Sequence, residues 1–153
     1  MKEKNKIDYK KQGKRNRAAG LRFEAKVREE LEKMGWVVDK WTNTVDYDKL
    51  KLVPAKRKFN PFLKIMVIGT GFPDFIGIKR IGEKYDVIGI EVKRKGYLSK
   101  IEQGMAHWLL ENKIFSKFLI AKSIKEGRKI KVEFLNFSEY YSRDKERKKI
   151  KKS

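Results

Sequence analysis

Two runs of strand-forming residues on either side of a tight-turn sequence constrain the fold of this chain more than any other feature. Phe75 to Arg80 and Tyr85 to Lys93 are rich in Ile and Val and flank the sequence "IGEK". Glycine at the first turn position suits a two-residue type II′ turn at Gly82-Glu83. The numbers of opposite residues in such a hairpin add up to 165. The pattern therefore predicts two antiparallel strands in one fixed register.

This register brings three charged residues together. Asp74 falls opposite Glu91, and Lys93 lies two residues further on, on the same face of its strand. Like charges that face each other directly are unfavourable unless a positive charge lies between them. A divalent metal ion would remove the repulsion, and carboxylates without thiolates suit Mg²⁺, with Mn²⁺ as a substitute. Alternatively, Lys93 is only a counter-ion on a solvated strand, but the nearly continuous apolar runs favour burial on both faces.

The same three residues suit phosphodiester hydrolysis. Two carboxylates can hold a hard cation, which polarises a phosphate and lowers the pKa of a bound water. Lys93 would orient that water or stabilise charge on the phosphate. We therefore expect a metal-dependent hydrolytic site on this hairpin.

The net charge indicates the class of partner. The chain has 40 Lys and Arg residues against 20 Asp and Glu, a net charge of +20. A basic N-terminal arm, residues 1–17, carries +6, and a basic C-terminal tail, residues 143–153, carries +5. The remaining domain, residues 18–142, therefore still carries +9 of the total of +20. A basic folded body favours DNA as the partner over a merely solvated Lys-rich surface.

The composition also excludes several classes of protein. A chain of 153 residues with 40% hydrophobic residues can fold as one domain and is not disordered. No apolar run approaches the roughly 18 residues of a membrane span. The absence of cysteine excludes disulfides and thiolate metal sites. We expect an intracellular, cytoplasmic protein without membrane association, and the Lys-rich composition suits a hot-growing host, such as a thermophilic archaeon or its virus.

Other elements follow from hydrophobic periodicity and capping. An apolar stripe predicts a helix from Ala18 to Met34, and a capping box formed by Ser99 and Glu102 predicts a second helix from Ser99 to Lys113. The polar, basic stretch from Asp46 to Pro61 reads as a long irregular loop. Further strands are expected at Trp36 to Trp41, Phe115 to Lys122 and Ile130 to Phe137. The predicted order of elements is α-β-β-β-α-β-β.

Several of these motifs together resemble a known group of enzymes. "FPDFIGIK" followed by "EVK" resembles the Pro-Asp…Glu-x-Lys signature of the PD-(D/E)xK nuclease superfamily. "GLRFEAKVREELEKMGWVV" is similar to the first helix of that superfamily, which supplies a further acid, here Glu24. "WTNT" and "GYLSKIEQGMAHWLLENK" resemble stretches of VRR-NUC domains, in which an early helical glutamine, here Gln103, joins the site. Archaeal Holliday junction resolvases share the layout and the basic character. The resemblance covers Gly20 to Lys122.

The resemblance implies a restriction-endonuclease-like α/β domain, with a central mixed sheet flanked by helices. It also implies a Mg²⁺-dependent DNA nuclease, an endonuclease rather than an exonuclease, for structured or branched DNA in repair, recombination or replication. Asp74 and Glu91 would be the metal ligands, together with the main-chain carbonyl of Val92, and Lys93 would be the catalytic lysine. Glu24 would act through water, and Gln103 would support the site.

Basic residues of the N-terminal arm, of the loop between Asp46 and Pro61 and beside the site are candidates for contacting DNA. They are Lys14, Arg15, Arg17, Lys56, Arg57, Lys58, Arg94 and Lys95. Phe59 could stack on a base, and His107 is expected to be an exposed helical residue. The alternatives are a homodimeric Holliday junction resolvase, a flap or single-strand nuclease, a restriction-type endonuclease, and a basic DNA-binding protein that keeps the fold without activity.

Overall fold

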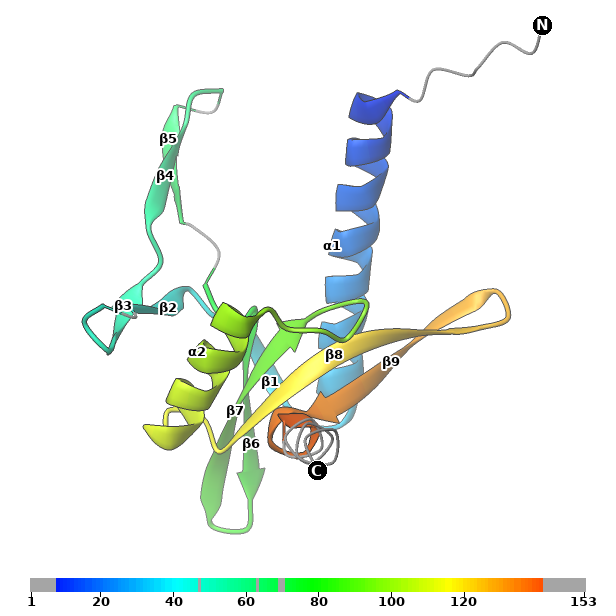
Figure 1. The fold of residues 1–153 in the computed structure, drawn as a ribbon. Coiled ribbons are helices and arrows are strands. Elements are labelled where there is room, and N and C mark those ends of the chain that lie inside the picture. Colours follow the sequence, from blue (N-terminus) through cyan, green and yellow to red (C-terminus); the bar gives the residue numbers. More distant parts are fainter. Residues whose placement is uncertain (1–7, 47, 63, 69–70, 142–153) are drawn as a thin grey trace, which may run out of the picture.

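A five-stranded mixed β-sheet with a helix on each face forms the body of the protein in the computed structural model of the chain (Figure 1). The structure describes residues 8–46, 48–62, 64–68 and 71–141, with residues 57–60 and 65–68 described by their backbone alone. The strand order is β1-β6-β7-β8-β9, in which only β7 and β8 pair in parallel. The fold is therefore α/β with a central mixed sheet, as predicted.

The bounds of the helices and strands are as follows: α1 Tyr9–Lys33, β1 Val37–Lys40, β2 Asn43–Asp46, β3 Lys51–Pro54, β4 Arg57–Asn60, β5 Ile65–Ile68, β6 Phe75–Ile81, β7 Lys84–Val92, α2 Lys100–Glu111, β8 Lys117–Glu126 and β9 Lys129–Asn136.

The central hairpin has the predicted register. β6 and β7 pair from Phe75↔Ile90 to Ile81↔Lys84, so opposite residue numbers add up to 165. Gly82 has a φ of +63°, which a type II′ turn requires at its first central position and which glycine adopts without strain. The turn chemistry and the two-residue period of the strands thus fix which side chains lie opposite one another.

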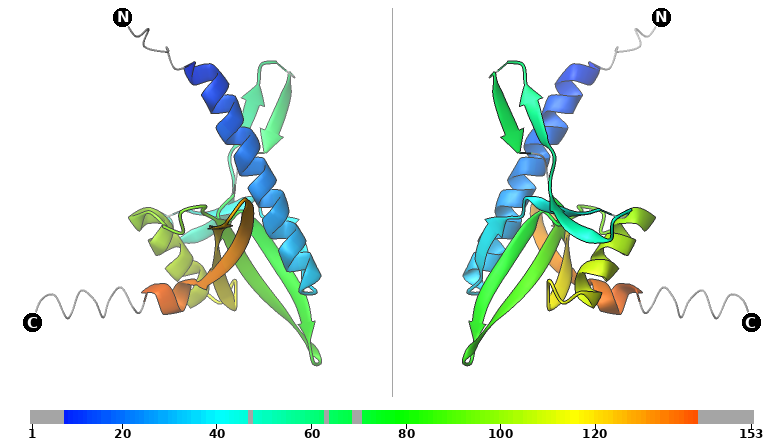
Figure 2. Two further views of the ribbon diagram at one scale, coloured as in Figure 1. Left: turned by 90° about the vertical axis from the view of Figure 1, so that its right-hand side faces the viewer. Right: turned by 90° about the vertical axis from the view of Figure 1, so that its left-hand side faces the viewer.

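Helix α1 begins nine residues earlier than expected, and part of the predicted N-terminal arm is therefore helical. Asp8 caps the helix, since its side chain accepts a hydrogen bond from the backbone N–H of Lys11 at 3.2 Å. The apolar stripe predicts a start at Ala18, but the preceding residues are mostly Lys, Arg and Gln, which favour a helix without supplying a buried face. In Figures 1 and 2 this first half of α1 extends beyond the sheet.

Two apolar clusters hold the layers together. On one face, Phe23, Val27 and Leu31 of α1 pack against the central strands, including Ile88 and Ile90 of β7. On the other face, Ala106 and Leu109 of α2 pack against a cluster rich in phenylalanine that includes Phe115, Phe118 and Phe137. Ser99 and Glu102 form the predicted capping box at the start of α2. The central strands are therefore covered on both faces.

The stretch from Asp46 to Pro61 is not one irregular loop, so this prediction was wrong. β2 pairs with β3, and β4 pairs with β5, as two separate antiparallel hairpins. Asp46 holds the first turn, because its Oδ1 accepts hydrogen bonds from the backbone N–H groups of Asp48 and Lys49 at 3.0 and 3.1 Å. Strands of four residues carry too little alternation of polar and apolar side chains to be recognised from sequence.

Strand β8 is longer than expected, whereas β9 has the predicted length and begins one residue earlier. β8 continues to Glu126 and joins β9 through a two-residue turn that contains Gly127, whose φ is +60°. Residues 137–141 are helical. The predicted C-terminal tail and residues 1–7 of the predicted arm lie outside the described residues, and the division into arm, domain and tail stays a prediction. No helix in the described part of the chain combines the length and the apolar character that a membrane crossing requires.

Candidate active site

The end of the central hairpin brings Asp74 and Glu91 into direct contact. Glu91 Oε2 accepts a hydrogen bond from the backbone N–H of Asp74 at 3.0 Å, and Asp74 Oδ2 accepts one from the backbone N–H of Val92 at 2.8 Å. Each carboxylate is thus held by the opposite strand, one step beyond the last paired residues, Phe75 and Ile90. The predicted pairing of these two carboxylates is confirmed.

A close backbone approach fixes Asp74 on its other side. The Asp74 carbonyl accepts a hydrogen bond from the Trp41 N–H at 3.1 Å, and Phe72 donates to the Asn43 carbonyl at 2.8 Å. A Cβ atom at Gly71 would stand 2.4 Å from the Trp41 carbonyl oxygen, so this position requires glycine. The chain that leads into Asp74 is therefore tied to the segment that follows β1.

Burial controls the protonation of both carboxyl groups. Glu91 is only 6% exposed, and it is the one charged residue among the described residues that is fully buried. Burial, together with the neighbouring charge of Asp74, raises the pKa of the Glu91 carboxyl to about 9. Burial also raises the pKa of Asp74, although the hydrogen bond from Val92 acts in the opposite direction. Ionisation of both groups is therefore unfavourable here without additional positive charge.

This arrangement fits a hard divalent cation. The pKa of Glu91 stays raised although the nearby ammonium group of Lys93 lowers it, so the side chains present do not balance the two carboxylates. Oxygen donors of this kind suit Mg²⁺. Among the described residues no group of three or more His, Cys, Asp or Glu side chains could hold a metal ion. The predicted ligand set has only two carboxylates, plus the carbonyl of Val92, whose participation stays a prediction.

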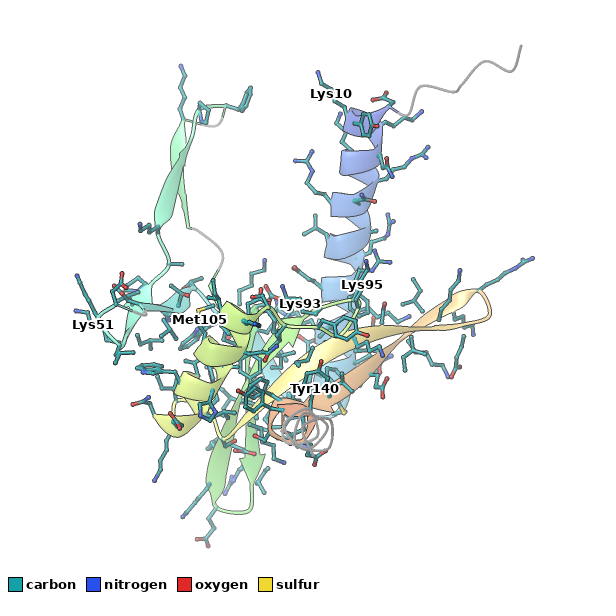
Figure 3. The ribbon with its side chains drawn as sticks, in the orientation of Figure 1. Lys10, Lys51, Lys93, Lys95, Met105 and Tyr140 are labelled. Carbon is teal, nitrogen blue, oxygen red and sulfur yellow. The ribbon has the colours of Figure 1, made fainter. Side chains whose placement is uncertain are left out.

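Lys93 lies at the end of β7, beside the start of α2 (Figure 3). Its Nζ is 3.8 Å from Glu91 Oε1, which confirms that the lysine shares the patch, but it lies only 2.7 Å from Glu102 Oε1. Burial lowers the pKa of Lys93, and its contacts with Glu102 and Glu91 raise it by more, so the ammonium form is favoured. Glu102, rather than Glu91, is the close ionic partner of Lys93.

Glu102 is a site residue that the sequence interpretation missed. Its Oε2 accepts a hydrogen bond from the backbone N–H of Ser99 at 2.9 Å, as the capping box predicts, and its Oε1 accepts one from Lys93. Burial acts to raise the pKa of Glu102, but these hydrogen bonds outweigh it and lower the pKa. The capping box uses only one of the two carboxylate oxygens of Glu102. The second oxygen, which the capping box leaves over for another donor, was the signal in the sequence that could have identified Glu102 as a site residue.

Glu24 approaches the site from α1, as the resemblance implied. Burial and the charge of Asp74 raise the pKa of Glu24, which places the two carboxylates within electrostatic range of each other. Lys40, at the end of β1, lies 3.7 Å from Glu24 and lowers the pKa values of both Glu24 and Asp74. Lys40 was also missed, because nothing in the local sequence shows that β1 ends beside α1.

Two further candidates, Gln103 and His107, lie on α2 and contact residues outside the acidic pair. Gln103 donates from Nε2 to the Leu98 carbonyl at 2.9 Å, so it contacts the segment leading into α2 and not the carboxylates. His107 is exposed and lies 2.9 Å from Glu111 on the same helix, as expected for a surface residue. Neither contact shows a role in chemistry, and the supporting role of Gln103 stays a prediction.

The predicted DNA-contacting residues fall into three groups. Lys14, Arg15 and Arg17 are exposed on the projecting half of α1, whose far end is marked by Lys10 in Figure 3. Arg94 and Lys95 are exposed just after β7, beside Lys93. Lys56 is exposed, whereas the side chains of Arg57, Lys58 and Phe59 lie outside the described residues. Binding of DNA by these residues stays a prediction.

The chain matches no protein-family model, no curated protein and no solved structure. The assignment of a function therefore rests on the geometry and chemistry of the site.

Proposed function

We propose that this protein is a metal-dependent DNA nuclease, an endonuclease that acts on structured or branched DNA. The observation that carries the proposal is the contact between Asp74 and Glu91 in a buried position where the protein supplies too little positive charge for both. A pair of acids in such a place destabilises the fold unless it has a ligand. The restriction-endonuclease-like identity of the fold, suggested by the resemblance, is part of this proposal.

The acidic pair would bind Mg²⁺, with Mn²⁺ as a substitute. The metal ion, when bound, polarises a phosphate and acidifies a water. Asp74 and Glu91 are already held in position by backbone N–H groups, so ligation needs only the loss of a proton and no rearrangement of the hairpin. The Val92 carbonyl is the third ligand that the resemblance implies.

Lys93 would act on the phosphate or on the attacking water. It is protonated, partly exposed and held by Glu102 at one side of the acidic pair. An ammonium group so placed stabilises negative charge that develops on the phosphate oxygens, or orients the water that attacks the phosphorus. Glu24, whose pKa is raised by burial and by the charge of Asp74, would orient a further water through its carboxylate.

The basic surface would supply the affinity for DNA. Exposed Arg and Lys side chains lie along α1 and after β7, and their charge is available to neutralise phosphates. Binding through the backbone carries little sequence information, which suits a nuclease that recognises DNA structure.

The test is cleavage of a panel of labelled DNAs with and without Mg²⁺. The panel contains a duplex, a single strand, a flap and a four-way junction. Asp74→Asn should abolish cleavage and leave binding equal or tighter, since it removes a negative charge from the site. Asp39→Asn is the matched control, because Asp39 is exposed on β1 and outside the cluster. Equal cleavage by Asp74→Asn and the parent would refute the proposal, and binding without cleavage of any substrate would favour an inactive DNA-binding protein.

A further inference from the structure

A cavity of about 380 Å³ lies between α1, the segment that follows Lys93 and the turn between β8 and β9. Its lining is strongly cationic: Arg22, Lys26, Arg94, Arg128 and Lys129. Among the residues that the structure describes, no acidic one lines it. Within the described part of the chain none of these five side chains takes part in an ion pair, whereas Lys131 nearby is paired with Glu126 at 2.6 Å. Five unpaired cations around one cavity favour an anionic ligand.

The inner wall of the cavity is apolar. Phe23 and Ile130 contribute to it, and Ala19 lies beside them on α1. Phe23 is 5% exposed and belongs to the apolar core between α1 and the sheet, so it provides a rigid wall. A ligand that suits both the cationic lining and the apolar wall has a flat apolar ring and an attached phosphate. A nucleotide has this chemistry, and arginine and aromatic side chains bind unpaired bases and their phosphates.

The cavity is close to the acidic pair but separate from it. Arg94 directly follows Lys93, and its carbonyl is fixed by hydrogen bonds from the Ser123 N–H and hydroxyl, both at 3.1 Å. On α1, Arg22 lies about 160° around the helix from Glu24, which is within range of Asp74. Arg94 thus links the cavity to the site through the chain, whereas Arg22 and Glu24 lie on different sides of α1.

We propose that this cavity binds one unpaired nucleotide of the substrate strand. Its base would lie against Phe23 and Ile130, and its phosphates would contact Arg22, Arg94 and Arg128. This inference rests on the proposed nuclease function and narrows the substrate to DNA that has an unpaired segment. The volume, near the lower end of the usual range for small-molecule sites, accommodates one nucleotide and not a duplex.

A variant that fills the cavity without changing its charge gives the sharpest test. Ala19→Trp places a large side chain at the apolar wall, and Ala18→Trp places the same side chain on the adjacent exposed position as a control. Binding of a fluorescent 15-nucleotide single strand and of a blunt duplex is measured by anisotropy in EDTA. Circular dichroism confirms that both variants are folded.

We expect Ala19→Trp to weaken binding of the single strand about tenfold and to leave duplex binding within about twofold, since one base loses its apolar contact. Ala18→Trp should bind both DNAs like the parent. The double variant Arg22→Ala/Arg128→Ala removes two charges from the cavity and should weaken binding of the single strand. The loss should exceed that in Lys84→Ala/Lys117→Ala, which removes two exposed charges near the opposite end of the sheet. This second comparison tests the proposal independently of the filling variant.

Three results would overturn the inference. One is equal loss of single-strand and duplex binding in Ala19→Trp, and another is parent-like binding of the single strand by Ala19→Trp and by Arg22→Ala/Arg128→Ala. The third is displacement of the single strand by micromolar adenosine monophosphate, which would make the cavity a site for a free nucleotide. Because EDTA prevents cleavage, these outcomes are independent of the nuclease assay, and failure of either proposal can be recognised without the other.

Discussion

Replacement of Glu91 by glutamine should change how the stability of the protein depends on pH. The pKa of Glu91 is about 9 in the folded protein, whereas it is near the ordinary value of 4.5 in the unfolded chain. Between these pH values the folded state keeps a proton that the unfolded state releases, so the free energy of unfolding falls as the pH rises. The slope for one such group is about 1.4 kcal/mol per pH unit. The metal-free parent should therefore lose about 2.7 kcal/mol between pH 5.5 and 7.5 from this group.

Glu91→Gln should remove this loss. Glutamine has no proton to release, and its amide oxygen can still accept the hydrogen bond from the Asp74 N–H that now reaches Glu91 Oε2. The difference in stability between variant and parent should grow with pH in favour of the variant. Urea unfolding at pH 5.5, 6.5 and 7.5 in EDTA, followed by tryptophan fluorescence, gives the three free energies. Glu83→Gln, in the exposed turn of the same hairpin, is the matched control and should leave the slope unchanged.

Mg²⁺ should offset the fall in the parent's free energy of unfolding that a rise in pH causes. The metal ion binds the ionised carboxylates, so the parent should gain more stability from Mg²⁺ at pH 7.5 than at pH 5.5. Glu91→Gln should gain little at either pH, because it has lost one ligand. If the stability difference between Glu91→Gln and the parent is the same at all three pH values, Glu91 is not held protonated by burial and the reasoning fails.

Three further predictions concern the lysine, its partner and the basic surface. Lys93→Ala should reduce cleavage by roughly 10²–10³ while Mg²⁺ still raises the melting temperature, and full recovery in excess Mg²⁺ would show that Lys93 is only a counter-ion. Glu102→Gln should lower kcat about tenfold, because one amide oxygen cannot accept from both Ser99 and Lys93. Ser99→Ala should instead cost about 1 kcal/mol of stability and leave kcat unchanged; equal kcat losses in the two variants would leave Glu102 with a structural role only. Duplex binding should weaken steeply with salt, by about −0.9 in log K against log salt for each neutralised phosphate, and a flat dependence would exclude a role for the basic surface.

The central hairpin was the part of the fold most completely predictable. A two-residue turn with glycine at its first position leaves one register, and the alternation of side chains then assigns Asp74 and Glu91 to one face. The capping box at Ser99 predicted the start of α2 in the same local way. These features depend on residues that are neighbours in sequence or across one turn.

Elements without a local signal were not predictable. The start of α1 at Tyr9 has no apolar stripe, and the short strands between Asn43 and Asn60 are recognisable only when paired. The region is polar, as predicted, but its backbone forms paired strands and not an irregular loop. Pairing between short strands depends on where the flanking chain leads, and a sequence window does not contain that information.

Residue pattern and composition were enough to predict that Asp74, Glu91 and Lys93 share a patch, that the sheet is covered on both faces and that the body of the protein is basic. Three further features became visible once the elements were packed together: Glu102 holds Lys93, Lys40 pairs with Glu24, and Arg22 and Arg128 border one cavity. The reason is physical. Register follows from local turn geometry, whereas an ion pair between separate elements and the burial that shifts a pKa depend on how helices and strands pack in three dimensions.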